Sequence, residues 1–116
     1  MKRLTKSYFT HQLDKEISRI VRTKGYCIKC GKIDNLQTAH IISRSNRTVR
    51  WDLKNVLCLC AGDHINFAHK NPLLYAEFIK EYLGDDEYEQ LKIRATKIKK
   101  WTIPEMQSLL NKFRKM

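Results

Sequence analysis

The sequence predicts an α+β fold, with a zinc-stabilised core of two short strands and a helix between flanking N- and C-terminal helices. Three observations predict it. Apolar residues recur at helical spacing near the N-terminus and again throughout the C-terminal part. Short β-branched segments lie between these regions, and four cysteines surround them. A chain of 116 residues has a modest core that gains from a metal clip, so we expect one domain over residues 1–116.

The N-terminal helix is expected over about residues 10–24. Thr10 is its candidate N-cap, and Gly25 is placed to end it in a left-handed conformation. The apolar residues that define its buried face are Leu13, Ile17, Ile20 and Val21.

Helices are also expected over about residues 72–115. Asn71 and Pro72 form an N-cap followed by proline at the first helical position, and Gly84 ends that helix. Asp85 begins a second helix, with acidic residues at its start and Lys97, Lys99 and Lys100 at its end. Thr102 and Glu105 form a capping box that opens the last one.

The core is expected over about residues 25–70. A knuckle containing Cys27 and Cys30 precedes a strand-like segment at 38–42, and a polar, basic loop covers 43–50. A second strand is expected within residues 51–60. Asp63 is then the candidate N-cap of a helix that carries His64.

The cysteines predict a structural zinc site. Cys27 and Cys30 have the C-x-x-C spacing that lets two sulfurs reach one tetrahedral ion from a tight turn. Cys58 and Cys60 point to the same face of a strand, so four cysteines are the most economical ligand set. Two alternatives stay open for the fourth ligand: Asp63 beside Cys27, Cys30 and Cys60, or His64.

The charge and the absence of targeting signals indicate the partner and the cellular compartment to expect. The net charge of +11 favours a polyanionic partner, and DNA is the partner we expect. No segment approaches the length of an apolar membrane span, and residues 1–7 are basic without the apolar run of a signal peptide. We therefore expect a reducing cytoplasm, bacterial or of an infected host cell, where paired thiols bind metal.

The segment Ala39-His40-Ile41, with Asn55 and His64, resembles the HNH motif of ββα-metal endonucleases. The resemblance extends to small phage HNH proteins, including the NinG-like recombination proteins, and covers about residues 25–83. Its further matching segments are Gln37-Thr38-Ala39-His40, Ser43-Arg44, Arg50-Trp51-Asp52-Leu53-Lys54-Asn55-Val56, Cys60, and Asn71 with Tyr75.

The resemblance implies a metal-dependent hydrolase that cuts DNA phosphodiester bonds. His40 resembles the general base that activates water, and Asn55 the residue that fixes the hairpin and orients His40. His64 resembles a ligand of the catalytic divalent ion, for which we expect Mg²⁺ or Mn²⁺. Ala39 stands where many such sites carry another ligand, so the ion would rely on His64, the DNA phosphate and a neighbour such as Asp52 or Asp63. His69 lies five residues after His64, off the same α-helical face, and is expected at the surface; contact with the ion or the phosphate is the alternative for this residue.

Arg44, Arg47 and Arg50 lie in the loop after His40 and are the candidate DNA-binding residues, because guanidinium groups suit phosphate oxygens. Two other functions fit the same sequence. One is a catalytically inactive zinc module that binds DNA, and the other is a zinc-stabilised module that binds proteins through its C-terminal helices.

Overall fold

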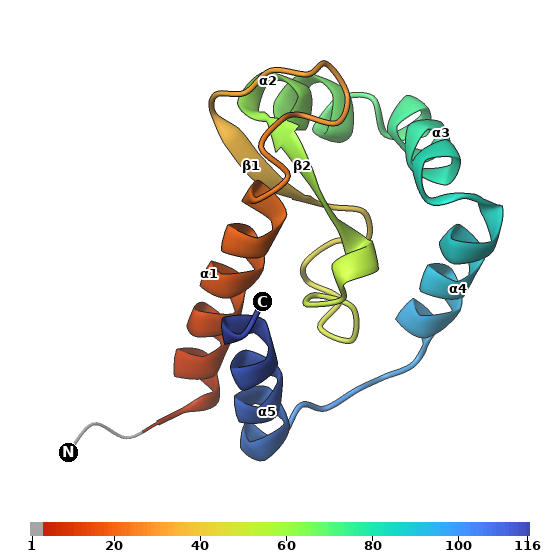
Figure 1. Ribbon diagram of the computed structural model, residues 1–116. Coiled ribbons are helices and arrows are strands. Elements are labelled where there is room, and N and C mark those ends of the chain that lie inside the picture. Colours follow the sequence, from red (N-terminus) through yellow and green to blue (C-terminus); the bar gives the residue numbers. More distant parts are fainter. Residues whose placement is uncertain (1–3) are drawn as a thin grey trace.

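The computed structural model describes residues 4–116, so the first three residues of the basic N-terminal segment lie outside the described part. It has an α+β architecture with one two-stranded antiparallel sheet, as the sequence predicts (Figure 1). The elements in order are α1 (Lys6–Arg22), β1 (Leu36–His40), the 3₁₀ turn η1 (Leu53–Asn55), β2 (Val56–Cys60), α2 (Ala61–Asp63), the π-helical turn η2 (His64–His69), α3 (Pro72–Leu83), α4 (Asp85–Thr96) and α5 (Ile103–Arg114).

Helix α1 begins one turn earlier than predicted. Its N-cap is Thr5, whose hydroxyl accepts a hydrogen bond from the Tyr8 N–H at 3.1 Å, and Thr10 lies within the helix. The earlier start adds Phe9 to the buried face of Leu13 and Ile17. At the other end the helix stops at Arg22, and Gly25 follows with a φ of +82°.

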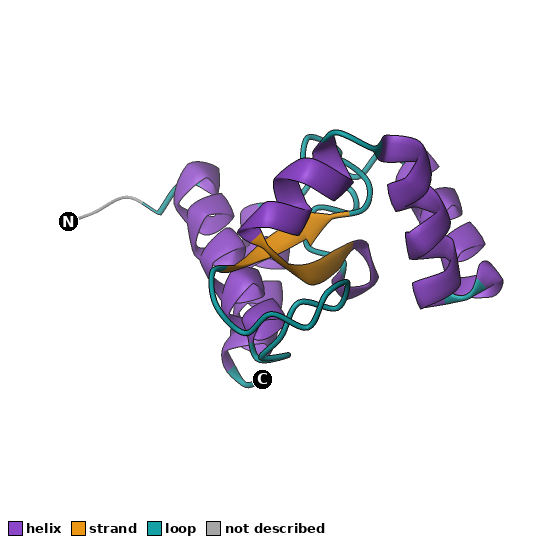
Figure 2. Cartoon of the chain, turned by 90° about the horizontal axis from the view of Figure 1, so that it is seen from above, coloured by secondary structure: helices purple, strands orange, loops and turns teal. Residues whose placement is uncertain are grey.

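The hairpin forms the centre of the molecule. Strand β1 pairs with β2 from Leu36 opposite Cys60 to His40 opposite Val56. All five residues of β2 are buried, because both of its faces are covered by other parts of the chain. Figure 2 shows α2 and η2 lying over the two strands, which gives the order strand, strand, helix.

The C-terminal helices lie close to their predicted positions. Asn71 is the N-cap residue of α3, although its side chain donates to the Asn66 carbonyl at 2.7 Å instead of capping. Both halves of the capping box at Thr102 and Glu105 are present. Helix α4 ends at Thr96, so the three lysines expected in its last turn lie beyond it. Within the described residues, no helix combines the length and apolarity needed to cross a membrane.

Two buried clusters hold the fold together. The first joins α1 to α5, which lie side by side in Figure 1, and consists of Phe9, Leu13, Ile17, Trp51, Val56, Met106, Leu110 and Phe113. The second joins the hairpin to α3, and consists of Cys27, Ala39, Leu57, Leu59, Cys60, Tyr75 and Ile79. Because β2 contributes to both clusters, it connects the two halves of the core.

Replacing Leu13 by alanine tests the packing of α1 on α5. Leu13 is fully buried, so Leu13→Ala should lower the free energy of unfolding by about 2–5 kcal/mol. Leu73→Ala is the matched control, because Leu73 is 83% exposed and should change stability by less than about 0.5 kcal/mol. Urea denaturation with zinc present measures both, and equal losses would contradict this packing.

Candidate metal centre and histidine cleft

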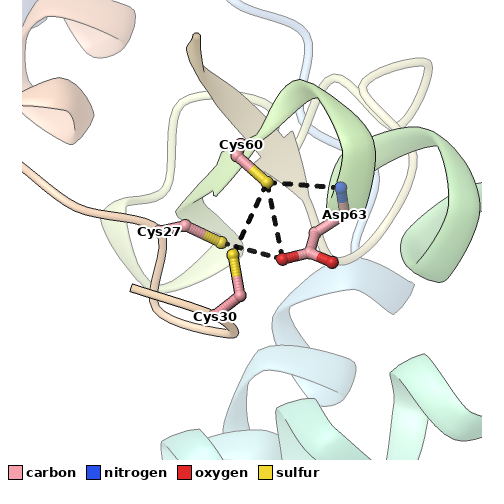
Figure 3. Close-up of side chains that lie close together, drawn as sticks. All are labelled: Cys27, Cys30, Cys60 and Asp63. Carbon is pink, nitrogen blue, oxygen red and sulfur yellow. Dashed lines mark hydrogen bonds between the residues drawn. The ribbon is translucent and has the colours of Figure 1, made fainter. Parts of the chain in front are cut away.

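Four potential metal ligands converge at one end of the hairpin. The ligand atoms of Cys27, Cys30, Cys60 and Asp63 all lie within 4.8 Å of one another (Figure 3). The Cys30 and Cys60 sulfurs are 3.7 Å apart, and Asp63 Oδ2 lies 3.2 Å from the Cys27 sulfur and 3.5 Å from that of Cys60. Tetrahedral zinc with bonds of about 2.3 Å needs sulfurs about 3.8 Å apart, so the spacing suits this ion.

Local backbone structure places each of these ligands. The knuckle turns because the Gly31 N–H donates to the Cys27 carbonyl at 2.8 Å, and Gly31 takes a φ of +83°. Cys60 ends β2 and is also the N-cap of α2, where its sulfur accepts from the Asp63 N–H at 3.4 Å. One strand end therefore supplies a thiol and, one turn later, a carboxylate.

The chemistry of the four groups also suits a divalent cation. The neighbouring Asp63 carboxylate raises the pKa of the Cys30 thiol to about 12. In turn, hydrogen bonds from the thiols hold the pKa of the Asp63 carboxyl below its ordinary value, and the bond from Cys30 has the largest effect. Four acidic groups in contact repel one another when all are ionised. A bound Zn²⁺ removes this repulsion by replacing the protons, which is how thiolate sites couple metal binding to proton release.

Cys58 is not part of this cluster, so the predicted ligand set of four cysteines is wrong. Cys58 is buried in the middle of β2, opposite Thr38. Sulfurs two residues apart on one strand face are separated by about 7 Å, too far to share one tetrahedral ion unless the chain bends. Asp63 takes the fourth position in the cluster. It is also the predicted N-cap residue before His64, at the start of η2, but its side chain makes no capping hydrogen bond there. His64 is not in the cluster either.

His40 lines a cleft of about 870 Å³, which contains none of the cysteine-cluster ligands among its lining residues. Its Nε2 lies 3.0 Å from the Arg50 carbonyl oxygen, which can only accept, so Nε2 carries the proton and Nδ1 keeps a free lone pair. Burial lowers the pKa of His40, and the charges of Arg44 and Arg50 lower it further, against the opposing effects of the Arg50 carbonyl and Asp14. The ring is therefore neutral at pH 7.

Asn55 fixes the loop that carries this carbonyl. It is fully buried, and its Oδ1 accepts from the Ile42 N–H at 2.7 Å. Its Nδ2 donates to the carbonyls of Ile42 and Val49, at 3.0 and 2.9 Å. Both ends of the loop are thus bound to one side-chain amide. One of these ends, Val49, directly precedes Arg50, whose carbonyl binds His40.

His64 and His69 form a pair, although α-helical spacing places His69 off the face of His64. Their ring centroids are 4.7 Å apart, and both residues line the cleft. Residues five apart diverge by about 140° on an α-helix, but η2 is π-helical, and its i→i+5 bonding returns His69 to the face of His64. The expectation that His69 lies off this face is wrong, whereas its predicted exposure at the surface is confirmed. A π-helical turn has no clear sequence signal, so only the pairing of two histidines at this spacing could have suggested it.

The His64 ring has one nitrogen free for a ligand. Its Nδ1 lies 2.8 Å from the Gln37 side-chain oxygen, an acceptor, so Nδ1 donates and Nε2 keeps its lone pair. Burial lowers the pKa of His64, followed by the charges of His69 and His40. Neutral imidazoles are the form that binds metal ions.

Neither predicted acidic neighbour lies free beside these histidines. Asp52 caps η1 and pairs with Arg94 at 2.7 Å, and Asp63 belongs to the cysteine cluster. Ala39 is fully buried in the cluster beneath α3, on the strand face opposite that of His40. A longer side chain at position 39 would enter the core.

The three loop arginines have different surroundings. Arg50 binds the Asp14 carboxylate through two nitrogens, at 2.6 and 3.0 Å, and its side chain is only 11% exposed. Arg47 donates to the Thr10 hydroxyl at 2.8 Å while remaining exposed. Arg44 is exposed and lines the cleft with Lys92 of α4. Of the three, Arg44 is best placed to meet a ligand in the cleft.

No protein-family model, curated protein or solved structure matches this chain.

Alanine substitutions in β2 separate the two sets of cysteines. Cys60→Ala should abolish binding of one zinc ion per chain, because it removes a ligand from the cluster. Cys58→Ala should leave the zinc content unchanged, since its sulfur lies outside the cluster although it shares the strand and is similarly buried. Zinc analysis of the purified proteins, with cobalt substitution to count thiolate ligands, measures both. Loss of zinc from Cys58→Ala alone would contradict the assignment.

Proposed function

We propose that this protein is a metal-dependent endonuclease of the HNH, or ββα-metal, type that hydrolyses DNA phosphodiester bonds. The observation that carries the proposal is the environment of His40. A neutral imidazole lies in a cleft with its Nε2 bound to a backbone carbonyl, and the loop bearing that carbonyl is tied down by Asn55. This arrangement suits a general base whose tautomer and direction are fixed in advance.

In the proposed reaction, His40 Nδ1 accepts a proton from the water that attacks phosphorus. Asn55 is a positioning residue, because it acts on His40 only through the loop. Tyr75 is also a positioning residue. Its hydroxyl donates to the His40 carbonyl at 3.3 Å, and this hydrogen bond connects α3 to the end of β1. Arg44 and Lys92 hold the phosphate backbone in the cleft.

The catalytic ion is assigned to His64 and His69, with the remaining ligands supplied by water and the DNA phosphate. A bound divalent ion supplies charge stabilisation for the phosphate and the departing oxygen. Two imidazole ligands favour Mn²⁺ or a later transition ion over Mg²⁺, which prefers oxygen ligands. We assign Zn²⁺ to the cysteine cluster, as a separate structural site. Its role is structural because Cys60 and Asp63 directly precede the turn that carries the two histidines.

Nicking of supercoiled plasmid tests the function. Metal-dependent nicking should fall about 10²- to 10⁴-fold in His40→Ala, the range expected for loss of a general base. His11→Ala is the matched control, because His11 is an exposed histidine of α1 that does not line the cleft. Zinc content must be equal in all samples, and Mg²⁺, Mn²⁺ and Ni²⁺ are each added to protein freed of loosely bound ions.

Since a base must be unprotonated, nicking should be constant above the pKa of His40 and fall as the pH drops through it. Burial lowers that pKa, so the midpoint should lie below 6.5, its ordinary value. Tight, salt-sensitive DNA binding without nicking under any metal would replace the nuclease by the DNA-binding module, and weak, salt-insensitive binding would favour the protein-interaction module.

If His64 and His69 both bind the catalytic ion, removing either one should weaken metal binding. His69→Ala should raise the metal concentration needed for half-maximal nicking by at least about tenfold, because it removes one of two protein ligands. His64→Ala should do the same, and His11→Ala should not. A titration of nicking rate against Mn²⁺ measures the shift, and an unchanged His69→Ala titration would remove His69 from the site.

A further inference from the structure

Asp14 of α1 lies outside the segment that resembles HNH proteins, yet its carboxylate is fully engaged beside the cleft. Its Oδ1 accepts from Arg50 Nε at 3.0 Å and from the Trp51 indole N–H at 2.8 Å. Its Oδ2 accepts from Arg50 Nη2 at 2.6 Å. Burial raises the pKa of Asp14, but the hydrogen bonds from Arg50 and Trp51 hold it below its ordinary value, so the carboxylate stays ionised at neutral pH.

Arg50 connects this carboxylate to His40. Its guanidinium is held by Asp14, while its carbonyl oxygen accepts the hydrogen bond of His40 Nε2 at 3.0 Å. The bidentate pair fixes the Arg50 side chain in one orientation, and the Trp51 bond fixes the next residue. The carbonyl between them therefore has a defined position relative to α1.

We propose that Asp14 is a positioning residue for His40, acting through Arg50 to keep the imidazole proton on Nε2 and the Nδ1 lone pair directed into the cleft. The catalytic part of this inference rests on the proposed nuclease function. Without the carboxylate, the Arg50 guanidinium loses its partner and the carbonyl loses its fixed position. His40 then divides between two tautomers, and the one protonated on Nδ1 cannot accept a proton from water there.

This role differs from a general contribution to folding. Helix α1 is attached to the rest of the molecule by the buried side chains of Phe9, Leu13 and Ile17, which pack against α5 and Val56. Asp14 is not part of that cluster, although it accepts a hydrogen bond from one of its members, Trp51. Its removal should therefore leave the helix in place and release the residues around Arg50.

Asp14→Asn and its matched control Glu16→Gln test the proposal. Both replace a carboxylate of α1 by an amide, but Glu16 pairs only with Arg19, at 2.7 Å and three residues away on the same helix. Asp14→Asn should lower kcat for plasmid nicking by about tenfold to a hundredfold with little change in KM, as expected for a displaced reacting group. Glu16→Gln should match the wild type in both.

A spectroscopic measurement follows the tautomer directly. The chain has four histidines, so ¹⁵N-histidine labelling gives few signals, and His40→Ala identifies those of His40. The wild type and Glu16→Gln should show His40 protonated on Nε2, and Asp14→Asn should show a mixture. A wild-type tautomer together with a wild-type kcat in Asp14→Asn would overturn the proposal.

Two provisions keep the result decisive. If Asp14→Asn does not fold or hold zinc, Arg50→Met replaces it under the same criteria, because it removes the guanidinium but keeps the carbonyl. If the wild-type protein does not nick DNA, the nuclease function fails, while the tautomer still decides whether Asp14 positions His40.

Discussion

The side-chain amide of Asn55 is the interaction on which the site depends. It makes three hydrogen bonds to backbone groups of Ile42 and Val49, and the Asn55 carbonyl accepts a fourth from the Ile41 N–H at 2.9 Å. A buried amide left without partners costs about 1–3 kcal/mol per unsatisfied group, so the loop has little freedom to move away from it. The end of β1, the loop and the start of β2 thus form one rigid unit around a single side chain.

The loop closed by Asn55 is also where the C-terminal elements attach. Thr48 donates to the Lys97 carbonyl at 2.7 Å and accepts from the Lys99 N–H at 3.1 Å. The Trp101 indole donates to the Arg47 carbonyl at 2.9 Å, and its ring meets Trp51 edge to face. The segment that crosses from α4 to α5 is therefore anchored on this loop (Figure 1). The cleft is lined by α1 on one side and by α3 and α4 on the other, and α5 packs on α1. Because the segment held by this loop joins α4 to α5, the loop helps to set the position of both sides of the cleft.

What the sequence could predict depended on whether the signal was local. The Thr102–Glu105 capping box, the proline at the start of α3 and the glycine after it are local signals, and their helices lie where predicted. The choice between Cys58 and Asp63 is decided by where β2 ends, and alternation along a strand cannot locate that end. The pairing of His64 with His69 depends on a π-helical turn, whereas the spacing was interpreted with α-helical geometry. The partner of Arg50 is 36 residues away on α1, and no pattern near either residue indicates their contact.

These contacts divide the basic residues of the chain into two groups. The sequence has 23 lysines and arginines against 12 acidic residues, and the excess by itself suggests that any arginine near His40 binds phosphate. Next to His40, however, the Arg50 charge is balanced by Asp14. On α4, the Arg94 charge is balanced by Asp52. An unbalanced guanidinium at Arg50 would oppose the positive charge that an imidazole gains when it accepts a proton. Pairing it with Asp14 reduces that opposition, while Arg44 keeps an exposed charge on the cleft. Lys92 also lines the cleft, and its ion pair with Glu89, at 3.0 Å, is exposed to solvent on α4. In the proposed nuclease, the cations that shape the site are thus distinct from those that hold the substrate.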